Sequence, residues 1–345
     1  MTAAEWLSWL TLRPAASGLE AGVLSEIEAA CAHLVDESGP DGAGNLVLRR
    51  HGGGQGPLLL IAAHVDQVCL WAKEILPGGF VRISAPGINP ALLAGTRVRA
   101  GELLGVVGMT PPHLRRPGAE GSQPAAADLC CDLGEDEQVV GSQLRPGDPI
   151  FFASQPSGLG EGRFTGAGLD NRAGVAACLG ALEQLSGQSL WPELAIVLTS
   201  SEEVGLVGAA ATAASLKPDL AVAVDVTYGQ GLDTPPDLSL PLGHGPAIGR
   251  GPNCHPGFER FLARAARQSS LPCQVELLPG HSGTDAWAMQ ISGSGVRTAT
   301  LSIPLLYMHT PVEVVALADV QWSADLLAGA VMRLDADSYQ EIVTW

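Results

Sequence analysis

The sequence predicts an α/β protein with a mostly parallel central sheet, helices on both faces of the sheet, and an inserted small all-β domain. Four almost continuous apolar runs are typical of central strands buried on both faces of a parallel sheet. These runs span residues 58–63, 194–198, 220–224 and 299–306. Between about 69 and 164 the sequence pattern changes to short β-prone segments separated by Gly and Pro, and no amphipathic helix is expected there. We therefore predict a main domain formed by 1–68 and 165–345, and an inserted β domain at 69–164.

The N-terminal part of the main domain begins with two predicted helices, at 5–12 and 19–35. In the second, apolar residues from Val23 to Leu34 recur at helical spacing. A strand at 45–50 lies between two glycine-containing turns and precedes the first apolar run.

The inserted domain is predicted from its short β-prone pieces. These pieces span residues 80–84, 96–99, 103–107 and 150–153. The polar tract at 115–127 predicts a long loop, and loops of that length are functional or mobile. His113 lies just before this tract, and we interpret it as a loop histidine that is less suited to contact a substrate than to face solvent.

The C-terminal part alternates helices and strands, which predicts right-handed βαβ crossovers. The expected elements are a helix at 173–184, a strand at 194–198, a helix at 207–216, a strand at 220–224, a helix at 258–268, a strand at 274–278, a helix at 286–290, a strand at 299–306 and a closing helix at 323–334.

Composition excludes several classes of partner. The 345 residues carry a formal net charge of -17 and contain only 19 Lys and Arg, so no basic stripe is available to bind nucleic acid or an anionic membrane. Seven cysteines without a CxxC pair favour a reduced, cytoplasmic protein. No apolar stretch approaches the length of a membrane span, and the N-terminus lacks the pattern of a signal peptide.

Acidic and histidine side chains follow the apolar runs. The candidates are His64 with Asp66, the pair Glu202-Glu203, Asp225 and His309, and Asp170 lies at the start of a predicted helix. Ligands of open α/β sheets bind outside the carboxyl ends of the strands, so we expect these groups in one crevice. We expect Glu202 and Glu203 to point in different directions from the end of a strand, because successive side chains on an extended backbone alternate.

This set of side chains suits divalent metal ions. Histidine and carboxylate ligands fit Zn or a similar ion, and one carboxylate can bridge two such ions. Two metals about 3.5 to 4 Å apart activate water in phosphatases, nucleases and aminopeptidases. The residues alone leave these classes open.

Seven ordered segments resemble the M42 family of metalloaminopeptidases, which includes the glutamyl and tetrahedral aminopeptidases and some proteins labelled cellulase. The segments are 63–66, 108 with 111–114, 169–172, 199–205, 224–226, 283–286 and 307–313. They span nearly the whole chain. The resemblance implies a catalytic peptidase domain, with the inserted domain serving as lid and assembly element.

The resemblance also implies a role for each residue. Asp170 should bridge two divalent ions, Zn in the first instance and Co or Mn as alternatives. One ion should be completed by His64 and Asp225, and the other by Glu203 and His309. Glu202 should be the general base, and Asp66 should orient the imidazole of His64. Asp285 should support the site or orient the substrate amine. The expected partners are short peptides and further copies of the chain, in a homo-oligomer that the family forms as a dodecamer.

Three positions depart from the family pattern. Gln67-Val68-Cys69 follows Asp66 where the family has Glu-Val-Gly, Ala167 stands where a Lys is common, and Asn171 replaces a second Asp. None of these changes removes a proposed ligand. Among the remaining histidines, His281 lies close to Gly283-Thr284-Asp285 and is a weaker candidate for substrate contact.

Three other functions stay open beside the aminopeptidase. A metal-dependent deacylase or amidase needs the same ligands with a different pocket. A non-catalytic binding protein is disfavoured because the ligands and the base are all present. A glycosidase needs two carboxyls facing each other across a sugar about 5 to 9.5 Å apart, and adjacent glutamates do not offer that geometry.

Overall fold

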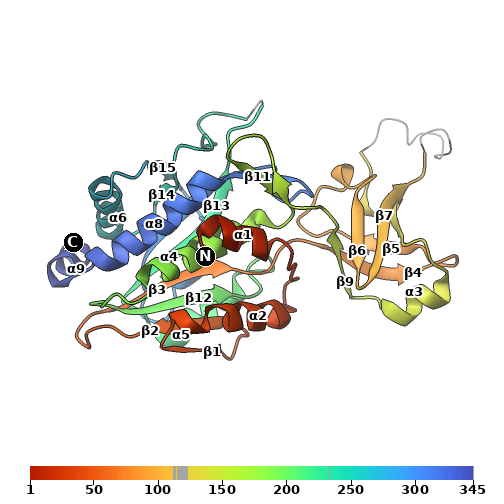
Figure 1. Cartoon of the computed structure of the whole chain (residues 1–345). Helices are drawn as coiled ribbons and strands as arrows, with labels where there is room; N and C mark the ends of the chain where they lie inside the picture. Colours follow the sequence, from red (N-terminus) through yellow and green to blue (C-terminus); the bar gives the residue numbers. More distant parts are fainter. Residues whose placement is uncertain (112–113, 115–122, 233, 345) are drawn as a thin grey trace.

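The structure is a computed structural model and describes residues 1–111, 114, 123–232 and 234–344. It combines a large mixed sheet flanked by helices with a small closed barrel that stands beside it (Figure 1). The predicted fold class is therefore confirmed.

The four central strands of the large sheet are parallel neighbours and correspond to the four apolar runs. In spatial order they are β12 (Glu193–Thr199), β3 (Leu58–His64), β13 (Leu220–Tyr228) and β16 (Arg297–Leu306). Their inner residues are buried, as expected of strands covered on both faces. Parallel neighbours end at the same edge of the sheet, and Thr199 of β12 is level with His64 of β3.

Further strands extend the sheet on both sides of this parallel centre. On one side lie β1 (Glu37–Pro40) and β2 (Leu46–Arg50), and on the other lie β17 (Glu313–Ala316), β11 (Arg163–Gly166) and β10 (Ser157–Gly158). Strand β14 (Ala247–Arg250) pairs antiparallel with β16 and carries β15 (Gln274–Leu277).

Side chains of the central strands alternate between two apolar layers. Leu59 and Ile61 of β3 pack in one cluster with the largest helices, whereas Leu60 and Ala62 pack in another. The first layer is covered by α1 (Ala3–Leu10), α2 (Ala21–Cys31), α4 (Leu169–Leu185), α6 (Pro256–Gln268) and α8 (Leu317–Arg333). The second is covered by α5 (Val207–Leu216) and α7 (Asp285–Gln290). Helix α4 is apolar on all sides because it lies between the sheet, α1 and α8.

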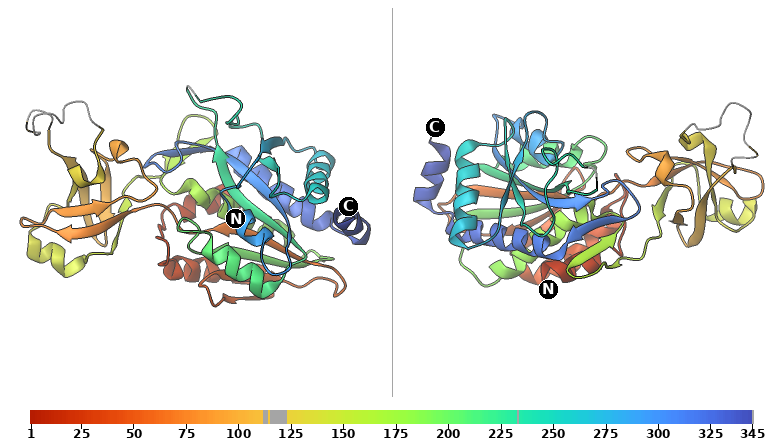
Figure 2. Two further views of the ribbon diagram at one scale, coloured as in Figure 1. Left: turned by 180° about the vertical axis from the view of Figure 1, so that it is seen from behind. Right: turned by 90° about the horizontal axis from the view of Figure 1, so that it is seen from above.

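The barrel has its own apolar core, separate from the layers of the main sheet. Its strands run in the order β4-β5-β8-β7-β6-β9, and pairing of β4 with β9 closes it. They are β4 (Leu70–Ile75), β5 (Val81–Ser84), β6 (Arg97–Ala100), β7 (Leu103–Met109), β8 (Leu129–Asp132) and β9 (Pro149–Phe152). The barrel lies at the opposite end of the molecule from α9 (Ala336–Val343) and the C-terminus (Figure 2).

The structure corrects two expectations about helices. The inserted segment does contain a helix, α3 (Glu137–Gln143), whose N-terminus is capped by Asp136 accepting hydrogen bonds from two backbone amides. Seven residues are too few for a clear amphipathic pattern. The helix predicted at 323–334 belongs to α8, and α9 follows it. The predicted loop at 115–127 falls largely outside the described residues, as does His113. No helix in the described ranges is both long and apolar enough to cross a membrane.

Candidate metal centre

The predicted ligands come together at the carboxyl edge of the central strands. His64 is the last residue of β3, Asp225 lies in β13, and His309 follows β16. Asp170 lies at the first residues of α4, where its backbone and that of Asn171 are not yet helical. Gly168, just before them, has a φ of 70°, and a Cβ there would collide with the side chain of Gln67. The glycine therefore allows the turn that carries Asp170 into the site.

Asp170 lies between the two histidines. Its Oδ1 is 3.2 Å from Nε2 of His64, and its Oδ2 is 3.2 Å from Nε2 of His309. Oδ1 of Asp225 is 3.5 Å from the same nitrogen of His64, and Oε2 of Glu203 is 3.5 Å from that of His309. Two groups able to hold a metal ion therefore share Asp170: one with His64 and Asp225, the other with Glu203 and His309.

Both imidazoles are oriented by a backbone carbonyl. Nδ1 of His64 is 3.0 Å from the carbonyl oxygen of Asp66, and Nδ1 of His309 is 3.2 Å from that of Gly87. A carbonyl only accepts, so Nδ1 must carry the hydrogen in each ring. In the neutral ring, Nε2 then presents a lone pair toward carboxylate oxygens, which is repulsive unless a cation lies between them. This arrangement suits a metal ion.

Glu202 and Glu203 do not extend a strand, which corrects the predicted reason for their placement. Strand β12 ends at Thr199, and Ser201 turns the chain with a φ of 56°. Both glutamates offer an oxygen to a third possible metal group, which also includes His64. A turn places neighbouring side chains by its own geometry, so the alternation of an extended chain does not apply.

Hydrogen bonds that its backbone amides donate to distant residues hold this turn. The carboxylate of Asp66 accepts from the backbone amides of Glu202 and Glu203 at 3.0 and 3.2 Å. Glu20 accepts from the amide of Ser201 at 2.8 Å. The carboxylate of Asp66 is 3.6 Å from Nδ1 of His64, so the close contact to that ring comes from its backbone carbonyl instead. The Asp66 side chain thus positions the glutamate pair directly.

Glu313 is a buried residue of the site that the sequence reasoning did not assign. Its two oxygens accept from the backbone amides of His309 at 2.9 Å and Asp170 at 3.2 Å. Burial raises the pKa of Glu313 to about 8, and the nearby Asp170 adds to the rise. Glu313 is the last residue of the segment 307–313, but nothing in that segment indicates its role.

The electrostatics of the site favour a cation. Burial raises the pKa of Glu202 to about 9 and that of Asp225 to about 6. Hydrogen bonds to Asp170 and Glu203 raise the pKa of His309 to about 11. The pKa of His64 is also raised, because Glu202 and other carboxylates outweigh the burial that opposes its charge. Oε1 of Glu203 is buried without a hydrogen-bond partner, so it has a free acceptor position.

A cavity of about 210 Å³ opens onto the ligands. Beyond the ligands and Glu202, its wall is formed by Val226, Thr227, Tyr228, Glu276, Ser282, Gly283, Thr284 and Met308. His281 is exposed, stacks on Trp287 with ring centres 4.2 Å apart, and is not part of this wall. Asp285 is buried and accepts a 2.6 Å hydrogen bond from the hydroxyl of Thr199, behind the ligands.

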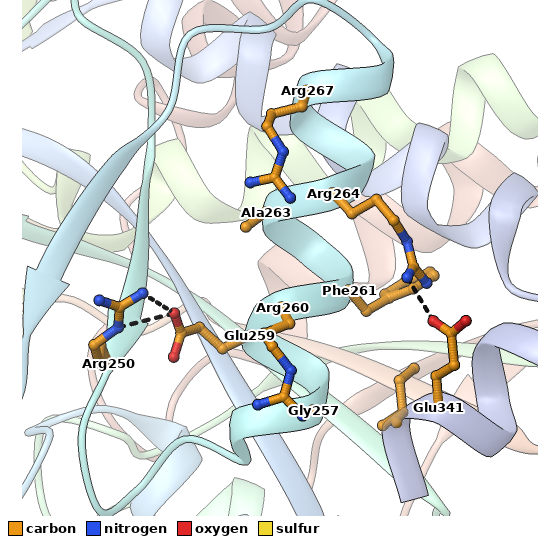
Figure 3. A pocket seen from close by; sticks show the side chains of 10 residues that line it. Arg250, Gly257, Glu259, Arg260, Phe261, Ala263, Arg264, Arg267 and Glu341 are labelled. Atoms are coloured by element: carbon orange, nitrogen blue, oxygen red, sulfur yellow. Dashed lines mark hydrogen bonds and ion pairs between the residues drawn. The ribbon is translucent and has the colours of Figure 1, made fainter. Parts of the chain in front are cut away.

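A second cavity, of about 310 Å³, lies along α6 (Figure 3). Arg250, Arg260, Arg264 and Arg267 surround it. Arg250 pairs with Glu259 and Arg264 with Glu341, each at 2.5 Å. It contains none of the residues predicted for the site.

Of the three positions that depart from the family pattern, two hold buried residues, Asn171 and Gln67, that make structural contacts. The amide of Asn171 donates to the carbonyl of Val224 at 2.8 Å and accepts from the amide of Gly174 at 2.9 Å. Gln67 is buried and lies 3.4 Å from the guanidinium of Arg172. Ala167 is partly buried against the barrel core. None of them takes the place of a ligand.

Comparison with known proteins identifies the family of the chain. The model of the M42 glutamyl aminopeptidase family matches residues 44–326. The chain belongs to the M42 family. This membership confirms the resemblance read from the seven segments, and the M42 chain is a hydrolase of the aminopeptidase class.

Similar proteins cover almost the whole M42 chain. A lysyl aminopeptidase of Pyrococcus furiosus is 33% identical over 89% of this chain and 90% of its own length. The structure of an aminopeptidase from the archaeon Desulfurococcus kamchatkensis has a TM-score of 0.91, with 32% identity and coverage of 99% and 98%. The TET1 peptidase of Pyrococcus horikoshii, which can assemble into a tetrahedron or a large octahedral shell, has a TM-score of 0.84, 28% identity and coverage of 96% and 100%.

Proposed function

We propose that this chain is a dimetal aminopeptidase that removes the first residue from peptides with a free N-terminus. The observation that carries the proposal is the position of Asp170, whose two oxygens each face the Nε2 atom of a different histidine at 3.2 Å. Asp170 would be shared by two ions, with His64 and Asp225 holding one of them and Glu203 and His309 holding the other. Mixed nitrogen and oxygen ligands suit zinc, with cobalt or manganese as alternatives.

The two ions, when bound, polarise the substrate carbonyl and lower the pKa of water. The chain itself supplies the proton transfers. Glu202 takes a proton from the attacking water and delivers it to the leaving nitrogen, so that a C–O bond forms as the C–N bond breaks. Burial raises the pKa of Glu202 to about 9, and bound cations would lower it toward the range of a general base.

Asp66 positions this base rather than contacting substrate. Its carboxylate accepts hydrogen bonds from the backbone amides of Glu202 and Glu203. One buried side chain therefore fixes the base and a metal ligand together. Misplacement of either by about 1 Å is enough to slow catalysis strongly.

The surroundings of the ligands suit a free N-terminus. The carboxylates form an anionic recess for the substrate ammonium group, and the 210 Å³ cavity is small. Gly87 of the inserted segment reaches His309, which supports a role of 69–164 as a lid over the domain formed by 1–68 and 165–345.

We also propose that the chain works as a closed homo-oligomer of the dodecameric type in the cytoplasm. The similar TET1 peptidase supports the assembly, and the seven free cysteines support a reducing compartment. Sedimentation of the purified protein as a monomer under all conditions would count against the assembly.

The test of the activity is a substrate panel with metal-stripped protein refilled with Zn, Co or Mn. We expect cleavage of aminoacyl anilides and short peptides only when the amine is free and only with metal. Cleavage of N-acetylated or non-peptide amides would instead favour a deacylase. Inactivity with every metal and every free-amine substrate would contradict the proposal.

A further inference from the structure

Among the described residues, Glu276 is the one carboxylate in the wall of the active-site cavity that belongs to none of the possible metal groups. Five carboxylate residues line this cavity, and the other four are Asp170, Glu202, Glu203 and Asp225. Glu276 comes from β15, whose outer position in the sheet is separated from the ligand-bearing strand β13 by β14 and β16. Its side chain therefore reaches the cavity from the side, beside the metal centre.

Within the part of the chain that the structure describes, two hydroxyl groups hold the carboxylate of Glu276. One oxygen accepts from Thr227 of β13, and the other accepts from Ser302 of β16 at 2.5 Å. Gly249 lies opposite Glu276 in the pairing of β14 with β15, and a Cβ at Gly249 would collide with Thr300. The intervening strand β14 therefore carries no side chain at the position paired with Glu276.

Glu276 has no cationic partner among the residues that the structure describes. None of the described Arg, Lys or His side chains forms an ion pair with it. Burial raises its pKa, while the two hydroxyl hydrogen bonds oppose the rise. A partly buried carboxylate without a countercharge is costly, so it is typical of a group that receives its cation from a ligand.

The position of Glu276 fits the side chain of the first substrate residue. Ser302, its hydrogen-bond donor, is paired with Asp225 in the register of β13 and β16, and adjacent strands lie about 4.8 Å apart. A substrate backbone at the metal ligands thus lies a few ångströms from Glu276. The four-carbon stem of lysine spans such a gap, and Tyr228 and Met308 offer apolar wall for it.

We propose that Glu276 selects the first residue of the substrate and favours a cationic side chain, lysine or arginine. The inference rests on the proposed aminopeptidase function. The ammonium or guanidinium group forms a charge-assisted hydrogen bond with the carboxylate that Thr227 and Ser302 hold in place. Acidic first residues are disfavoured, because they bring a like charge to Glu276.

The experiment compares lysyl and norleucyl anilides, which differ by the ammonium group at the end of the same stem. For the metal-loaded wild type we expect kcat/KM to be at least about tenfold higher for lysyl, given the strength of a buried charged pair. In Glu276→Gln the ratio should fall toward one, chiefly through loss of lysyl turnover, and Glu276→Asp should recover part of it. Glu102→Gln, an exposed glutamate of the barrel, should keep the wild-type ratio.

A wild-type enzyme that cleaves norleucyl as well as or better than lysyl would overturn the inference and leave the aminopeptidase standing. An equal loss for both substrates in Glu276→Gln would overturn it too, because that result indicates a structural role or contact with the α-amine. Inhibition of the wild-type enzyme by free lysine and by free norleucine makes the same comparison without any variant. If the metal-loaded wild type cleaves no free-amine substrate, the norleucyl anilide included, the aminopeptidase function itself is rejected.

Discussion

The buried carboxylate of Glu313 accepts a 2.9 Å hydrogen bond from the backbone amide of His309. Through its other oxygen it accepts from the amide of Asp170. One side chain therefore fixes the backbone of two proposed ligands, which come from segments far apart in the sequence. Supporting contacts of this kind orient the residues that bind a metal and tune their affinity.

Replacing Glu313 should weaken the ion held by Glu203 and His309 more than the other ion. Glu313→Ala removes both hydrogen bonds, and we expect a loss of about 10- to 100-fold in metal affinity at that position. Competitive titration with a chelator measures the two affinities separately. Glu102→Gln serves as the control. Metal affinities of Glu313→Ala equal to those of this control would show that His309 needs no such support.

Asp66→Asn should lower both activity and stability. The carboxylate accepts from two backbone amides and from the hydroxyl of Ser17 at 2.7 Å, and an amide offers only one oxygen. We expect a loss of about 1–3 kcal/mol in the free energy of unfolding, measured by denaturant titration of metal-free protein. Ser17→Ala removes one donor and leaves the carboxylate, so its effect should be smaller. Equal effects of the two substitutions would contradict the role given to the two amides.

Glu202→Gln should abolish most turnover without loss of metal. A neutral amide cannot take a proton from water, so kcat should fall by about 10²- to 10⁴-fold. Metal content measured by elemental analysis should stay at the wild-type value, because the proposed ligand sets do not include Glu202. Full turnover by this variant would exclude Glu202 as the base.

The metal-free protein should lose stability as pH rises from about 6 to about 9. The folded-state pKa values of Asp225 and Glu202 are raised to about 6 and about 9 by burial. A carboxyl with a raised folded pKa favours the folded state while protonated, and this advantage is lost as pH rises through that pKa. His309, with a pKa raised to about 11, acts in the same direction.

Melting temperatures of chelator-treated protein at pH 6, 7.5 and 9 measure this trend. Zinc should reverse it, because metal binding requires deprotonated ligands and becomes stronger as pH rises. A melting temperature of the metal-free protein that stays flat or increases over this range would contradict the predicted charge balance.

The central strands, and the meeting of the five candidate ligands at one edge of the sheet, could be predicted because most of these features leave a local signal. Strands buried on both faces remain apolar throughout, and the residue after such a run lies at the ligand-binding edge. His64 and Asp225 show this directly. The positive φ of Ser201 could not be predicted, because it depends on hydrogen bonds that the turn donates to Asp66 and Glu20, which are distant in sequence.

Glu276 and Glu313 left no comparable signal. Each is a single carboxylate on a short strand, and nothing in the neighbouring residues separates it from a solvated surface glutamate. Their roles depend on which strands pair: β15 with β14, and β17 with β16. Helix α3 was missed for a related reason, since seven residues hold fewer than two full turns of amphipathic pattern.

The most direct test of the central claim is anomalous diffraction from crystals of the zinc-loaded protein. The account predicts two peaks about 3.5–4 Å apart, one beside His64 and Asp225, the other beside Glu203 and His309, with Asp170 between them. A single peak, or peaks that Asp170 does not bridge, would contradict the dimetal centre.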